Sequence, residues 1–119
     1  MSQTAPIEIY GIGVDVPDGY LDKIMDAIDA VIDPISPDYG RAFRYYPVKG
    51  TWRSGRDSHP FDGRPGEITI ANEMRLEFIV KKKDLALVLE TIRKVHPYEE
   101  PAIDVIPQYE WSSVLNSCP

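Results

Sequence analysis

The order of the apolar patterns along the chain is the feature that most limits how this sequence can fold. Four segments show the alternation or the β-branched and aromatic composition of strands, and they are residues 7–13, 42–53, 73–81 and 102–111. Two segments repeat apolar residues every three or four positions, as amphipathic helices do, and they are residues 21–32 and 84–95. The chain therefore runs strand, helix, strand, strand, helix, strand.

This order predicts an α+β fold with a four-stranded antiparallel sheet. With right-handed crossovers, βαββαβ has one consistent solution, the ferredoxin-like fold, in which the strand order is 4-1-3-2 and two helices cover one face. A chain of 119 residues suits one domain, which we expect over residues 1–111. Residues 112–119 are mostly polar and are expected to form a C-terminal tail.

The same topology brings three connections to one edge of the sheet. They are residues 15–19, the long polar segment 54–72, and the corner at residues 96–101. Polar segments as long as 54–72 are usually functional or mobile. Ile68 and Ile70 alternate with Thr69, so this segment can hold a short extra strand. Both histidines of the chain, His59 and His96, are expected at this edge.

The corner between the second helix and the last strand concentrates chemically useful side chains in the sequence His96-Pro97-Tyr98-Glu99-Glu100-Pro101-Ala102. His96, Glu99 and Glu100, with His59 from the long segment, are candidate ligands of a divalent metal ion. The same residues also suit structural roles: the imidazole can cap the helix, Tyr98 can pack on the sheet edge, and Glu99 can bond backbone N–H groups. A small-molecule or anion site is a third alternative. No cofactor other than this candidate metal follows from the sequence.

The sheet face that the helices leave open is expected to be apolar. It should carry Ile79, an aromatic residue of the second strand, and Tyr109 or Trp111. A broad apolar face is an interaction surface, and a closed homo-oligomer is the natural way to bury it. Arg75 and Glu77, on the same face, are expected to pair across subunits.

Composition and motifs argue against several functions. The formal net charge of −6 and the absence of a basic stretch interleaved with aromatics disfavour nucleic acid as a partner. No run of about 18 apolar residues suits a membrane span. The residues before the first strand have no basic segment and no apolar stretch, so we do not expect them to be a secretory signal, and the single cysteine, Cys118, favours the cytoplasm. No nucleophile motif or phosphate-binding loop is present, so we expect a protein that is not an enzyme.

Four motifs in a fixed order support a family resemblance. They are Lys49-Gly50-Thr51-Trp52-Arg53, His59-Pro60-Phe61-Asp62-Gly63, Glu73-Met74-Arg75-Leu76-Glu77 and the corner extended to Val105. Together they resemble the small domain inserted in bacterial Nif-three-like proteins, of which this chain looks like a stand-alone version. That insert is ferredoxin-like and similar to the PII and CutA proteins, which are trimers. The resemblance implies a homotrimer that binds a small molecule or a protein partner.

The resemblance also has limits. The Gly-Ala-Gly segment that follows the first helix in the family is replaced here by Asp33-Pro34-Ile35-Ser36-Pro37. The di-metal site of the full family lies in two flanking lobes that this sequence lacks, so it is not carried over.

In a PII-like protein, the loop after the second strand senses ligands and contacts partners. Thr51, Trp52 and Arg53 lead directly into that segment here. Together with His59, His96, Tyr98, Glu99 and Glu100, they are the candidate ligand-binding residues. Arg53 and the loop arginines Arg56 and Arg64 can contact an anionic ligand, although Trp52 also suits the core or an interface.

Overall fold

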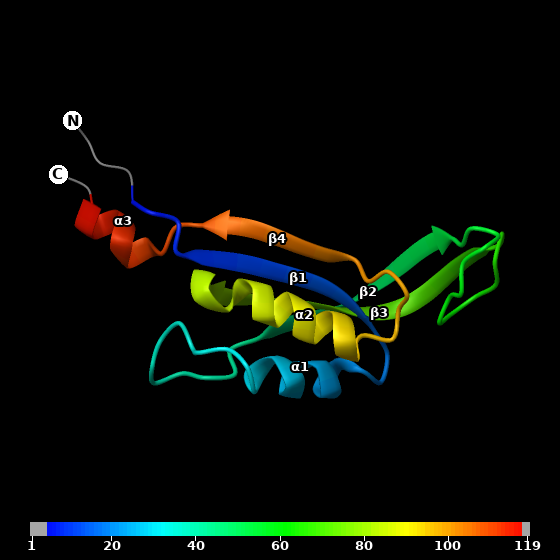
Figure 1. The fold of residues 1–119 in the computed structure, drawn as a ribbon, viewed down its shortest axis with the longest axis horizontal. Coiled ribbons are helices and arrows are strands. Elements are labelled where there is room, and N and C mark those ends of the chain that lie inside the picture. Colours follow the sequence, from blue (N-terminus) through cyan, green and yellow to red (C-terminus); the bar gives the residue numbers. More distant parts are fainter. Residues whose placement is uncertain (1–4, 118–119) are drawn as a thin grey trace.

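The computed structural model describes residues 5–117 (Figure 1). Its elements are β1 (Ile9–Pro17), α1 (Leu21–Asp29), β2 (Arg44–Arg53), β3 (Ile68–Lys81), a 3₁₀ turn (Lys82–Asp84), α2 (Leu85–Val95), β4 (Ile103–Gln108) and α3 (Trp111–Ser117). No helix within this range is long and apolar enough to cross a membrane. Cys118, on which the predicted cytoplasmic location rests, lies outside the described residues.

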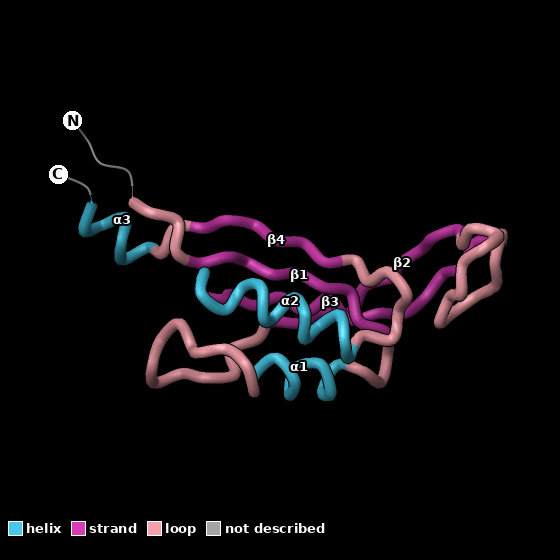
Figure 2. The backbone as a smooth tube through the Cα atoms, viewed as in Figure 1, coloured by secondary structure: helices cyan, strands magenta, loops and turns pink. Residues whose placement is uncertain are grey.

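The sheet confirms the predicted topology. Its strands lie in the order β2-β3-β1-β4, which is the predicted 4-1-3-2 read from the other edge, and all neighbours are antiparallel. The central pair β1 and β3 runs in register from Ile9 opposite Lys81 to Pro17 opposite Glu73. Helices α1 and α2 lie together on one face of the sheet (Figure 2).

The core forms between the two helices and alternate residues of the two central strands. Its buried members are Ile12, Val14 and Val16 of β1, Leu76, Phe78 and Val80 of β3, Ile24, Met25 and Ile28 of α1, and Val88 and Ile92 of α2. Each such side chain stabilises the fold by about 1.5–3 kcal/mol relative to exposure. The period of two in the strands and of three to four in the helices is thus the pattern of this core.

The structure corrects several predicted boundaries. Strand β3 begins at residue 68 rather than 73, because Ile68 pairs with Arg53 of β2, and the connecting loop shortens to residues 54–67. Strand β1 continues to Pro17 along the same ladder. Strand β4 ends at Gln108, which pairs with Ile9 at the start of β1.

The predicted tail contains a helix, α3, and Trp111 begins it instead of ending a strand. Beyond Gln108 the chain has passed the first residue of β1, so a longer strand has no ladder partner there. A helix satisfies its backbone hydrogen bonds internally, as the bond from Val114 N–H to the Glu110 carbonyl illustrates.

The open face of the sheet is less apolar than predicted. Arg75 lies across Gly13 and contacts three carboxylates of its own chain: Nη2 is 2.7 Å from Asp104, Nη1 is 3.3 Å from Asp15, and Nε is 3.6 Å from Glu77. Arg75 and Glu77 thus pair with each other within the chain, and their pairing across subunits stays a prediction.

Exposed apolar side chains nevertheless surround this ion-pair network. Tyr46 of β2, Ile79 of β3 and Ile106 of β4 share the open face by register and are all exposed. Tyr109 and Trp111, predicted on this face, lie beyond the end of β4 instead.

The molecule is elongated. Its radius of gyration is 17.0 Å and its extents are 56 × 31 × 24 Å, whereas a compact chain of this length has a radius of about 13.5 Å. The β2–β3 hairpin extends past the ends of β1 and β4, and α3 lies at the opposite end (Figure 1). No residue of the ten in β2 is buried, so the hairpin is a strand pair with little cover from its own chain.

Candidate functional site

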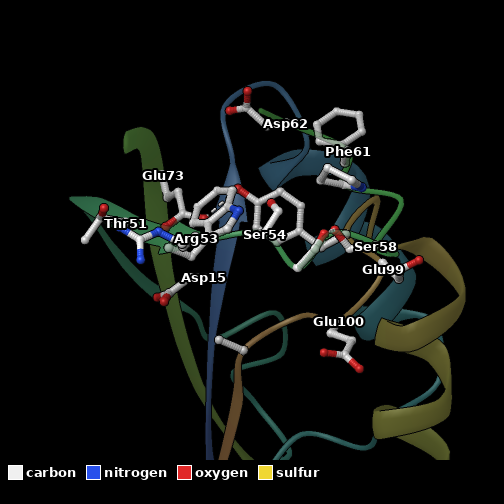
Figure 3. Close-up of a pocket in the computed structure, with 16 residues that line it drawn as sticks. Asp15, Thr51, Arg53, Ser54, Ser58, Phe61, Asp62, Glu73, Glu99 and Glu100 are labelled. Carbon is white, nitrogen blue, oxygen red and sulfur yellow. Dashed lines mark hydrogen bonds between the residues drawn. The ribbon is translucent and has the colours of Figure 1, made fainter. Parts of the chain in front are cut away.

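A cleft of about 410 Å³ lies where the three connections meet. Five segments line it: the end of β1, the end of β2, the following loop, the middle of β3, and the corner after α2. Figure 3 shows Thr51 and Arg53 on one side of it, with Ser58, Phe61 and Glu99 on the other. The predicted meeting of these connections at one edge is confirmed.

Hydrogen bonds close the loop and attach it to the corner. Ser54 N–H donates to the Glu67 carbonyl (3.4 Å), and Gly66 N–H donates to the Ser54 carbonyl (2.6 Å), so the base of the loop continues the hairpin. His59 N–H donates to both carboxylate oxygens of Glu99 at 3.3 Å. The predicted role of Glu99 as an acceptor for backbone N–H groups of a neighbouring loop is what the structure shows.

Tyr98 is the centre of an aromatic group. Its ring centroid lies 5.6 Å from that of Trp52, 6.0 Å from that of Phe61 and 4.8 Å from that of His96. Its hydroxyl donates a 2.6 Å hydrogen bond to Glu73. Burial, followed by this bond to the carboxylate, raises the pKa of Tyr98, so the phenol keeps its proton and remains the donor.

His96 is buried behind Tyr98 and both of its ring nitrogens are engaged. Nε2 lies 2.7 Å from the Asp15 carbonyl, to which it donates, and Nδ1 accepts from Tyr98 N–H at 3.1 Å. Burial lowers the pKa of His96, which favours this neutral tautomer. The imidazole ties the corner to β1 and does not cap the last carbonyls of α2.

Two polar side chains of the cleft are buried with few partners. Glu73 is only 3% exposed, and its carboxylate extends over Gly50, where any side chain would collide with it. Ser54 is 7% exposed, and its Oγ is the one buried side-chain polar atom of residues 5–117 without a hydrogen-bond partner. Unsatisfied groups of this kind are rare in folded proteins and require a physical explanation.

Six of the eight predicted site residues line the cleft, and they are Thr51, Trp52, Arg53, Tyr98, Glu99 and Glu100. His59 and His96 do not line it, although each contacts a residue that does.

The other ten lining residues were not among the predicted site residues, and they include Asp15, Ser54, Phe61, Asp62 and Glu73. The family resemblance could have indicated three of them, because its motifs include Phe61, Asp62 and Glu73.

The candidate metal ligands are not arranged as a metal site. Within residues 5–117, no three His, Cys, Asp or Glu side chains gather closely enough to hold an ion. His96 also has no ring nitrogen left for coordination in this arrangement. Metal binding by His96, Glu99, Glu100 and His59 therefore stays a prediction.

Comparisons with known proteins agree with the fold. No family model matches the chain. A GTP cyclohydrolase 1 type 2 homolog of Halalkalibacterium halodurans is 27% identical over 107 residues, which are 90% of this chain and 29% of that protein. The chain thus spans less than a third of the length of the curated relatives that it matches first.

Three solved structures show the same architecture. A NIF3-related protein of Bacillus cereus matches 92% of this chain and 28% of its own, with a TM-score of 0.71 at 22% identity. CutA of Synechococcus elongatus matches 96% of this chain and 93% of its own, with a TM-score of 0.65 at 13% identity. GlnK of Bacillus subtilis matches 85% of each chain, with a TM-score of 0.59 at 13% identity. The chain is therefore a distant homologue of one segment of the NIF3-related GTP cyclohydrolase 1 type 2 homologs, and it has the ferredoxin-like fold of CutA and GlnK.

Proposed function

We propose that this protein is a non-catalytic, homotrimeric module that binds a small ligand in the cleft between the loop 54–67 and the corner at residues 96–101. The observation that carries the proposal is the cleft itself. Its volume of about 410 Å³ and its mixed aromatic and polar lining suit a small molecule. The loop that forms one wall follows the second strand, as the ligand-sensing loop of PII-like proteins does.

The non-catalytic part rests on the fold and on how the polar groups are used. Tyr98 and Glu73 bond each other, and the imidazole of His96 bonds backbone groups on both sides. Catalysis by a hydroxyl nucleophile requires a base within hydrogen-bond reach. The hydroxyl of Ser58 donates to the Gly55 carbonyl instead of a base.

The homotrimer is proposed from the resemblance to PII and CutA proteins and from the uncovered surfaces of the sheet. The open face exposes Tyr46, Ile79 and Ile106, and β2 buries none of its residues against its own chain. Strand edges and apolar faces of this kind are normally covered. A ring of three copies covers them without leaving an open end.

Sedimentation and a thermal-shift screen test the proposal. We expect the 13.5 kDa chain to sediment as a trimer at micromolar concentration. In a screen of amines, organic acids, nucleotides and divalent metals, at least one class should raise the melting temperature, because a ligand that binds only the native state stabilises it. A monomer, or a screen without any stabilising class, contradicts the corresponding part of the proposal.

Metal binding at the corner remains the alternative, and exposed Glu99 and Glu100 beside the loop support it. Zinc, copper and cobalt titrations of the wild type and His96→Ala test it. Equal affinities in the two proteins remove His96 from the set of ligands.

A further inference from the structure

We propose that the cleft binds a small organic cation, with an ammonium group held between the rings of Trp52, Phe61 and Tyr98 and the carboxylate of Glu73. The inference rests on the proposed function, because it names the class of ligand that the same cleft takes. Four features of the lining support it: the rings, the charge balance, the unpaired Glu73 and the unsatisfied Ser54.

The three rings come from three segments and form walls instead of a stack. Trp52 belongs to β2, Phe61 to the loop and Tyr98 to the corner, and all of them line the cleft. The planes of Trp52 and Phe61 are tilted by 59° and 48° against that of Tyr98. A cation within about 6 Å of such ring centres is attracted to their faces, and quaternary ammonium groups are bound in aromatic cages of this kind.

The charge of the cleft is negative. Its lining contains one guanidinium, that of Arg53, and five carboxylates, those of Asp15, Asp62, Glu73, Glu99 and Glu100. Asp15 is paired with Arg75. Within residues 5–117, the other four carboxylates have no cationic side chain within ion-pair distance. A cleft with this excess of carboxylates attracts cations and repels anions.

Glu73 is the most buried of these carboxylates. It is 3% exposed, and Tyr98 supplies its one side-chain hydrogen bond within the described residues. Buried charges in proteins are normally paired, because the loss of water is costly when no counter-charge replaces it. An ammonium group in the cleft supplies that counter-charge.

Ser54 is a second, independent sign of a missing partner. Its Oγ is buried, lines the cleft and bonds no other group of residues 5–117. A serine hydroxyl both donates and accepts, so it can bond an ammonium N–H or a hydroxyl of the ligand. The cleft suits the anionic ligand expected from Arg53, Arg56 and Arg64 less well, because Arg53 is the only one of the three arginines that lines it.

The test uses Trp52 as the reporter. The chain has two tryptophans, so Trp111→Phe in α3 leaves Trp52 as the only one. Choline and its neutral isostere 3,3-dimethylbutan-1-ol are titrated into this protein while tryptophan fluorescence is followed. We expect saturable binding of choline and an affinity for the isostere that is lower by about tenfold or more, because the isostere cannot make the desolvated cation–π contact. Equal binding of the two compounds, or no response to choline, overturns the inference.

A pair of charge-neutralising variants locates the site. Glu73→Gln keeps an acceptor for the Tyr98 hydroxyl but removes the charge, and it should weaken choline binding by about tenfold or more. Glu77→Gln removes a carboxylate from the same face of the same strand outside the cleft lining, and it should leave choline affinity unchanged. Equal affinities in the two variants contradict the inference, and far-ultraviolet circular dichroism confirms that both are folded.

Two further probes separate this inference from the proposed function. Glutarate and zinc are titrated into the same protein, and its sedimentation is measured in parallel. If glutarate or zinc changes the fluorescence of Trp52 and choline does not, the cation inference is wrong while the binding module stands. If choline binds to a monomer, the cation inference stands while the trimer is wrong.

Discussion

His96 shows how one residue can carry a family motif for structural reasons. Its ring lies between the carbonyl of Asp15 on β1 and the amide of Tyr98 in the corner. Protonation of Nδ1 would replace an acceptor with a donor facing the N–H of Tyr98. The neutral form is therefore the one that holds the corner in place.

Acid should weaken the fold through His96. Burial lowers the pKa of His96 in the folded state. Below the ordinary histidine pKa of 6.5, the unfolded chain therefore binds more protons than the folded protein does. This contribution is complete above about pH 6.5 and is lost as the pH falls through that value toward the lower pKa of the folded state. Urea unfolding of the wild type between pH 7 and 5 should show a falling free energy, with a smaller slope in His96→Gln. Parallel profiles would contradict this role.

Gly50 should be required for the buried position of Glu73. A Cβ at residue 50 collides with the carboxylate of Glu73, which cannot move freely because Tyr98 holds it. We expect Gly50→Ala to lower the free energy of unfolding by about 1–3 kcal/mol, as overpacking does. Gly55→Ala is the matched control, since nothing lies within 4 Å of a Cβ there. Equal urea midpoints for the two variants would show that Glu73 adapts without cost.

At the scale of elements, the sequence predicts the strands and helices whose apolar residues recur with a regular local period. The alternation around Leu76, Phe78 and Val80 and the stripes of α1 and α2 predicted the central elements, because those residues face the core. The alternation of Ile68, Thr69 and Ile70 predicted a short extra strand in the loop and not the start of β3. Both isoleucines are exposed, so only their pairing with β2 shows that they belong to β3.

The same reasoning explains which parts of the cleft were predicted. The corner and the end of β2 are continuous motifs, and six of the predicted site residues in them line the cleft. Glu73 and Asp15 enter it through the register of β1 with β3, in which Pro17 lies opposite Glu73. A non-local register of this kind cannot be predicted from local sequence patterns. The same holds for the start of α3, which follows because β4 has no strand partner beyond Gln108.

The attachment of the loop 54–67 should depend on Glu99. The hydrogen bonds from His59 N–H to its carboxylate link the loop to the corner, beside the contact of Phe61 with Tyr98, and both His59 and Glu99 are exposed. We expect Glu99→Ala to increase hydrogen exchange of residues 55–62 by several-fold, because local opening becomes easier. Glu100→Ala removes the neighbouring carboxylate, which lines the cleft, and should change the exchange little. Equal protection in both variants would show that Phe61, edge-on to Tyr20 at 5.5 Å, holds the loop by itself.

At the scale of the whole molecule, the elongated shape leaves two parts of the chain outside the core. The radius of 17.0 Å comes from a hairpin and a terminal helix that extend from the two ends of the core. An isolated two-stranded hairpin is at best marginally stable in water. A second copy covering the hairpin and the open face would supply the burial that the chain itself does not.

A substitution at Ile106 tests whether the open face of the sheet forms the contact between copies of the chain. It is 57% exposed on β4 and shares the open face with Ile79. Specific interfaces bury about 800 Å² per partner, so a buried carboxylate near the centre of one is strongly unfavourable. We expect Ile106→Glu to shift sedimentation from trimer toward monomer at micromolar concentration. Leu87→Glu places the same charge at a 51% exposed apolar position on α2 and should remain trimeric. If Leu87→Glu dissociates while Ile106→Glu does not, the copies meet through their helices, and the open face of the sheet is left for another partner.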